Sequence, residues 1–179
     1  MDGLSVRIPT EIGLLQQGLT KLMISSNAFM TGTIPTEIGL LTRLQQLFLV
    51  NINLVGTLPS ELGSLQQLTV LALNHNALSG TIPSEIGQLR RVHNLNVQSN
   101  ALTGTVPTAL GSLSLLTMMA LANNAGLTGT LPFKEEVCAF AATFPLPATW
   151  IIDCHLLACP WDECTTIKCQ SPIGRDCSV

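Results

Sequence analysis

One proline recurs along the chain at an almost constant interval. The prolines are Pro9, Pro35, Pro59, Pro83, Pro107 and Pro132, and the intervals between them are 26, 24, 24, 24 and 25 residues. All but the first follow a Gly-Thr pair and one apolar residue. A fixed period of this length indicates one supersecondary unit that is stacked many times. The sequence therefore predicts a solenoid, and we call each unit a coil.

The rest of each coil has its own pattern. Leu71 and Leu73 alternate with other residues, which predicts a short strand with one inward face. A bend follows, where an asparagine amide can satisfy unpaired backbone donors and acceptors. This position holds Asn27, Asn76, Asn100 and Asn124, whereas coil two has Ile52 there, between Asn51 and Asn53.

The segment around proline completes the coil. Its Gly-Thr pair is expected to run extended into the proline, which suits the first position of a short helical turn. In coil three this turn would hold Glu85 near its start, where the helix dipole favours a carboxylate, and Gly87 would end it. Glu11, Glu37 and Glu61 occupy the same place in other coils, so dipole compensation explains them more simply than metal binding.

Together these residues resemble the plant-type leucine-rich repeat, L-x-x-L-x-x-L-x-L-x-x-N-x-L-x-G-x-I-P-x-x-L-G-x-L. The match is close at 41–132 and looser at 8–40. The resemblance implies an α/β fold, a curved right-handed solenoid of about five coils with a parallel sheet on its concave face. The family includes ectodomains of receptor-like kinases and secreted inhibitors of cell-wall-degrading enzymes. Residues 1–132 are thus expected to be the repeats, without an N-terminal cap.

Residues 133–179 differ in composition and are expected to form a C-terminal cap. They hold all six cysteines, Cys138, Cys154, Cys159, Cys164, Cys169 and Cys177, and both tryptophans. A cap would cover the open core and sheet edge of the last coil. The cysteine spacing differs from the paired C-x2-C of zinc knuckles, so disulfides are expected, with zinc or free thiols as alternatives.

The expected location follows from the tail. Disulfides imply an oxidising compartment, so we expect the protein outside the cell or at its surface. The first residues, "MDGLSVRIPTEIG", lack the features of a signal peptide, and the repeat is already under way at Ile8. The chain is therefore expected to be a fragment or to begin at an internal methionine.

Several function classes are not expected. The net charge is −3 without a basic run, which argues against nucleic acid as a partner. No stretch of 18 uncharged apolar residues predicts a membrane span. No arrangement of serine, cysteine and histidine suggests a nucleophile, and there is no phosphate-binding glycine loop. The sequence predicts a non-enzymatic protein without a cofactor.

The outward strand positions of the concave face are the candidate binding site. Interface hot spots favour aromatic anchors ringed by polar groups, and Phe48 is the one aromatic residue in the outward columns. The predicted contacts are Phe48, Val50, Val70 and Met118, with a rim of Gln46, Asn74, Asn94, Asn96 and Gln98. We expect this face to recognise a protein, a peptide or a glycan.

A structural role is the alternative function. Thr33, Thr57, Thr81, Thr105 and Thr130 form one column, and regular threonine columns occur on ice-binding solenoids. Such solenoids usually present two ranks on a flat face, and only one rank is predicted here, so threonine's preference for extended backbone explains the column. An ice-binding, adhesion or wall-associated protein remains the second reading, and a zinc-dependent tail the third.

Overall fold

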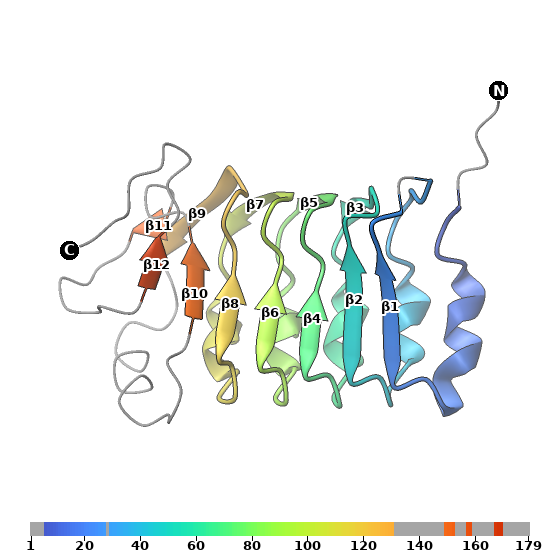
Figure 1. Ribbon diagram of the computed structural model, residues 1–179. Helices are drawn as coiled ribbons and strands as arrows, with labels where there is room; N and C mark the ends of the chain where they lie inside the picture. Colours follow the sequence, from blue (N-terminus) through green and yellow to red (C-terminus); the bar gives the residue numbers. More distant parts are fainter. Residues whose placement is uncertain (1–5, 28, 131–148, 153–156, 159–166, 170–179) are drawn as a thin grey trace.

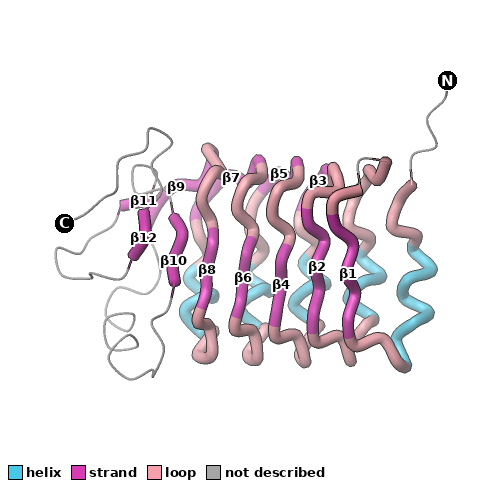
Figure 2. The backbone as a smooth tube through the Cα atoms, viewed as in Figure 1, coloured by secondary structure: helices cyan, strands magenta, loops and turns pink. Residues whose placement is uncertain are grey.

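The chain forms a stack of coils with three sides. The computed structural model describes residues 6–27, 29–130, 149–152, 157–158 and 167–169. One parallel sheet runs along the front of the stack, a second parallel sheet runs along its upper rim, and short helices lie behind (Figures 1 and 2). The parallel sheets and the stacked coils agree with the predicted solenoid.

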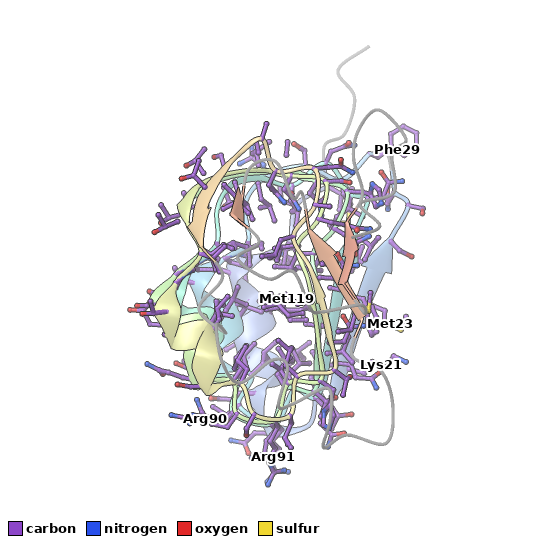
Figure 3. All side chains as sticks on the ribbon, turned by 90° about the vertical axis from the view of Figure 1, so that its left-hand side faces the viewer. Lys21, Met23, Phe29, Arg90, Arg91 and Met119 are labelled. Carbon is purple, nitrogen blue, oxygen red and sulfur yellow. The ribbon has the colours of Figure 1, made fainter. Side chains whose placement is uncertain are left out.

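The first sheet carries the strand that the leucine alternation predicts. Its order is β1 (Lys21–Ser25), β2 (Gln46–Val50), β4 (Val70–Ala72), β6 (Asn94–Asn96), β8 (Met118–Ala120), β10 (Thr149–Ile152) and β12 (Ile167–Cys169). Leu47, Leu71, Leu95 and Met119 are in register across four strands, and all are buried. Their side chains point into an aliphatic core, where Met119 is seen in Figure 3.

The second sheet was not predicted. It consists of β3 (Val55–Thr57), β5 (Ala77–Gly80), β7 (Ala101–Thr105), β9 (Gly126–Thr130) and β11 (Leu157–Ala158). Its inward residues Leu78, Leu102 and Leu127 are buried. The extended Gly-Thr segments thus pair with one another, and this satisfies backbone groups that an isolated extended segment would leave to water.

The helical side consists of 3₁₀ helices in the described residues. They are η1 (Thr10–Gln17), η2 (Thr36–Leu40), η3 (Ser60–Ser64), η4 (Ser84–Gln88) and η5 (Thr108–Ser112). Pro83 is the N-cap of η4, with φ −64° and ψ 140°, and not its first residue as predicted. The proline keeps extended backbone and the helix begins one residue later. Glu85 does lie in the first turn, as the dipole argument predicts.

Gly87 does not end its helix as predicted, because η4 continues to Gln88 and Leu89 is the C-cap. The glycine is needed for close approach instead. A Cβ atom at Gly87 would overlap the carbonyl group of Ala109 in the next coil, and a Cβ at Gly39 would lie 2.7 Å from the carbonyl oxygen of Glu61. The glycines therefore let the helical sides of neighbouring coils stack tightly.

The asparagine column makes the predicted backbone bonds and also links neighbouring coils. The Oδ1 of Asn76 accepts from the amides of Ile52 and Leu54, at 3.1 and 3.2 Å. Its Nδ2 donates to the carbonyls of Leu49 and Leu73, at 2.8 and 2.9 Å. Asn100 repeats the arrangement one coil further on, where it accepts from the Leu78 amide and donates to the carbonyls of Leu73 and Val97. Asn124 does the same with the Leu102 amide and the carbonyls of Val97 and Leu121.

The residue before each bend position has left-handed backbone. Ser26, Asn51, His75, Ser99 and Asn123 have φ between 52° and 58°. The chain has already left the strand of the first sheet at these residues. Their common conformation turns the chain from the first sheet towards the second.

The described part of the tail adds strands to both sheets. β10 pairs with β8, β12 pairs with β10, and β11 pairs with β9, all in parallel. Of the six predicted disulfide cysteines, only the backbone of Cys169 is described, so the disulfide prediction lies outside the described residues. The domain boundary at 132/133 also stays a prediction. In the described residues, no helix is long and apolar enough to cross a bilayer.

A candidate ligand-binding face on the first sheet

The outward residues of the first sheet form rows that cross the strands. The first row is Lys21, Gln46, Val70, Asn94 and Met118, and the second is Met23, Phe48, Ala72, Asn96 and Ala120. Neighbours in a row stand about 4.8 Å apart, the spacing of paired strands. We call this surface the concave face, following the expectation stated above.

Three of the predicted contact residues are brought together. Phe48 and Val50 are two residues apart on β2, so they share a face, and Val70 lies diagonally across from Phe48 on β4. Met118 lies two strands beyond Val70, with Asn94 between them, so it is not part of this cluster. Each predicted contact and rim residue is half-buried, a state that leaves surface free for a ligand.

Two residues that the prediction left out belong to the same cluster. Met23 is directly beside Phe48 in register and is 55% exposed. The Lys21 Nζ atom lies 5.9 Å from the centre of the Phe48 ring, within reach of a cation–π contact. Figure 3 shows Lys21 and Met23 together on the outer side of β1. The sequence could have indicated both residues, because Lys21 and Met23 occupy the positions in the preceding coil that correspond to Gln46 and Phe48.

In the second row, the alanines on β4 and β8 are far less exposed than Met23 on β1. Ala72 is 5% exposed and Ala120 is fully buried, although both are outward on their strands. The accessible apolar surface is therefore centred on Met23, Phe48 and Val50, which we call the Phe48 cluster. It lies nearer to the N-terminal end of the sheet than the prediction placed it.

Amide side chains of β6 lie two strands beyond Phe48, on the same face. Asn96 Oδ1 accepts from the amide of Gln98 at 3.2 Å, so part of the amide rim is already engaged. Asn94 Oδ1 is buried and has no hydrogen-bond partner, the one such side-chain atom in the described residues. An unpaired buried acceptor costs free energy, and rotation of the amide would let a ligand N–H or O–H satisfy it.

The described residues contain no cluster of three or more histidine, cysteine or acidic side chains that could hold a metal ion. A single charge, that of Lys21, accompanies the cluster's apolar side chains and neutral amides. Such a surface can bind an apolar side chain and hydrogen-bond a backbone or a hydroxyl group. It is suited to recognition.

Comparison with known families now decides the class of the fold. The family model described as Leucine Rich Repeat matches residues 67–89, a stretch that contains β4, β5 and η4. The fold is a leucine-rich-repeat solenoid. The resemblance seen in the repeats is thereby confirmed, whereas nothing in the comparisons bears on the cysteine-rich cap.

Solved plant receptors match the leucine-rich-repeat chain over most of its length. A TDR receptor gives a TM-score of 0.74 at 30% identity, over 91% of this chain and 25% of the other. The plant peptide hormone receptor RGFR1, in complex with RGF2, gives 0.71 at 28%, over 91% and 23%. The ectodomain of the Arabidopsis thaliana receptor kinase GASSHO1/SCHENGEN3, in complex with CASPARIAN STRIP INTEGRITY FACTOR 2, gives 0.70 at 35%, over 82% and 17%.

The chain thus spans a quarter or less of the length of these three receptors. A comparison with curated proteins gave no match. The similarity to receptor ectodomains supports a binding role for the leucine-rich-repeat chain.

Proposed function

We propose that the chain recognises a peptide or a peptide segment of a protein on its concave face, at the Phe48 cluster. The observation that carries the proposal is the contiguous apolar group of exposed Met23 and half-buried Phe48 and Val50, with the amide of Gln46 on the same strand. An aromatic anchor with a polar rim is the usual anatomy of an interface hot spot. The unpaired Asn94 Oδ1 supports a ligand that brings its own N–H donors.

The solved relatives support the same choice of ligand. RGFR1 is a peptide hormone receptor, and the receptor kinase HAESA was solved with the peptide hormone IDA and the co-receptor SERK1. A peptide offers backbone N–H and C=O groups to side-chain amides, as well as an apolar side chain to Phe48. An extracellular or cell-surface location agrees with these relatives. A glycan remains the second ligand class, since amides also bond sugar hydroxyls.

The test is selection of linear peptides from a display library on the purified chain, followed by calorimetric titration of the selected peptide. We expect Phe48→Ala to weaken its binding by at least about tenfold, because a hot-spot truncation typically costs 2 kcal/mol or more. Glu61→Ala is the control, because Glu61 is exposed in the first turn of η3, on the opposite side of the coil. Loss of binding in the control with full binding by Phe48→Ala would disprove the proposed face.

A further inference from the structure

The second sheet presents two ranks of outward residues, where the sequence predicts one. The rank before each glycine is Thr31, Val55, Ser79, Thr103 and Thr128, and the rank after it is Thr33, Thr57, Thr81 and Thr105. In β7, Thr103 and Thr105 are exposed on either side of Gly104, while Leu102 is buried. The two ranks therefore share one face, which we call the threonine array.

The array repeats regularly in two directions. Thr57 is beside Ser79 and Thr105 is beside Thr128 in the strand register, so each residue of the second rank adjoins the first rank of the next coil. Paired residues such as Thr57 and Ser79 stand about 4.8 Å apart across the strands, and the two ranks are roughly 6.6 Å apart along a strand. Successive members of one rank are therefore offset from one another by two residues in the register. Figure 1 shows the strands that carry it in a row along the upper rim.

The threonines of the second rank are held in place by the next coil. A Cβ atom at Gly56, Gly80 or Gly104 would lie 2.8–2.9 Å from the Cγ2 methyl of Thr33, Thr57 or Thr81. These methyl groups thus nest over glycines, whose φ values of 74–79° also disfavour any larger residue. A surface fixed in this way loses little conformational entropy when it binds.

The hydroxyl groups of the second rank are available. Within the described residues, the hydroxyls of Thr57, Thr81 and Thr105 make no hydrogen bond to protein. Threonines on the first sheet behave differently, since Thr69 donates to the Gln45 carbonyl at 2.9 Å and Thr117 donates to that of His93 at 3.0 Å. Neither rank contains a charged residue between Thr31 and Thr128, and Arg7 lies over Gly32 at the N-terminal end of the second rank, as Thr33 lies over Gly56. A matching ligand would be uncharged and periodic.

We propose that the threonine array binds the surface of ice. A single hydroxyl–water bond gains little over the bond it replaces in liquid water, so only many contacts formed in register can hold the protein there. The rigid methyl groups add apolar surface that disfavours the liquid. A protein partner would require an anchor side chain in a packed pocket, and the nine residues of the array include no aromatic residue. This activity is separate from recognition on the concave face.

The test is an ice assay on the purified full chain. We expect thermal hysteresis and inhibition of ice recrystallisation, and we expect Thr81→Lys and Thr103→Lys each to abolish both, because a charged side chain rises from the array. Thr42→Lys is the matched control, since Thr42 is exposed on the turn after η2 and outside the array. Circular dichroism would check the fold of each variant, and Phe48→Ala should keep full ice activity.

Three results would overturn the proposal. The first is a folded wild-type chain that neither shapes ice nor slows recrystallisation. The second is equal activity in Thr42→Lys and in both folded array variants, or a loss shared by all three. The third is binding to crystalline cellulose powder, weakened by Thr81→Lys, without any activity on ice, since this would assign the array to a crystalline polysaccharide.

Discussion

At the scale of single residues, two glycines in each complete coil have distinct duties. Gly80 has a φ of 74° and lies under the methyl group of Thr57, so both its backbone and its surroundings exclude a side chain. Gly87 lies in η4, where the backbone of the next coil approaches so closely that no side chain would fit. The repeated glycines thus set how closely coils stack on two of the three sides.

Replacement of Gly87 tests this account. Alanine normally favours helical backbone over glycine, yet we expect Gly87→Ala to lower the free energy of unfolding by about 1–3 kcal/mol, because its Cβ would overlap the Ala109 carbonyl. Gly18→Ala is the control, since nothing lies within 4 Å of a Cβ there and φ is −139°. Denaturant unfolding measures both, and similar midpoints for the two variants would contradict close stacking at Gly87.

At the scale of elements, interior and edge coils differ. Leu71 in β4 is 1% exposed between two paired strands, whereas β1 has a strand partner only in β2 among the described strands. Leu14 and Leu15 of η1 are 77% and 51% exposed, and shallow hollows of about 280 and 360 Å³ adjoin Leu14. Coil one thus has fewer stabilising contacts, and local opening is expected to begin there.

The asparagine amides are the polar links between these elements. We expect Asn76→Ala to cost more than a surface change, about 1–3 kcal/mol for each backbone group left unsatisfied, because Asn76 bonds groups of two coils. Asn74→Ala is the matched control, as Asn74 is half-buried two residues earlier on the concave face. Chemical denaturation would separate them, and an unchanged midpoint for Asn76→Ala would show that water replaces the amide at no cost.

At the scale of the whole molecule, the chain places two different surfaces on one scaffold. The Phe48 cluster is irregular, apolar and accompanied by Lys21, whereas the threonine array is periodic and consists of threonine, serine and valine. They lie on separate sheets that share the same aliphatic core. A change on either surface is therefore expected to leave the other surface's binding intact, provided that the core is intact.

The cysteine-rich tail is tested at this scale too. We expect reduction of its predicted disulfides to lower the unfolding temperature of the whole chain, because a cap over the last coil would loosen. Mass spectrometry of non-reduced protein from an oxidising compartment should find at most one or two free thiols. Six free thiols would contradict the disulfides, and bound zinc in stoichiometric amount would replace them.

Periodicity explains which parts could be predicted from the sequence. The inward leucines, the asparagine of the bend and the glutamate represented by Glu85 recur at one spacing. The same structure was therefore predicted independently from each coil. The second sheet could not be predicted in this way, because glycine weakens a strand signal and the segment resembles a loop. Its pairing depends on neighbouring coils, and for the same reason the sequence did not reveal the rank of outward residues before each glycine.

The sequence predicted which residues face outward at the candidate site better than it predicted where the exposed apolar surface lies. Alternation correctly placed Phe48, Val50 and Val70 on the outward face. Burial along that face depends on tertiary neighbours, so the sequence did not reveal that Ala120 is covered or that Met23 is exposed. Likewise, the left-handed backbone of His75 follows from the bend and has no signal in the residue itself.

The asparagine amides also give the stack a direction. Asn76, Asn100 and Asn124 each reach back to the preceding coil, and each satisfies a backbone amide N–H there: that of Ile52 in the bend, of Leu78 in β5 and of Leu102 in β7. Each of these coils therefore depends on the next coil to satisfy one of its backbone amides. Shortening the stack from the C-terminal side would remove the asparagine acceptor from these amides in the coil that remains. Removing a coil from the N-terminal side would instead leave the asparagine Oδ1 without its donor, and ladder bonds such as that from the His93 amide to the Thr69 carbonyl would also be lost. Two shortened stacks of equal length would accordingly differ in stability, depending on which end of the stack was removed.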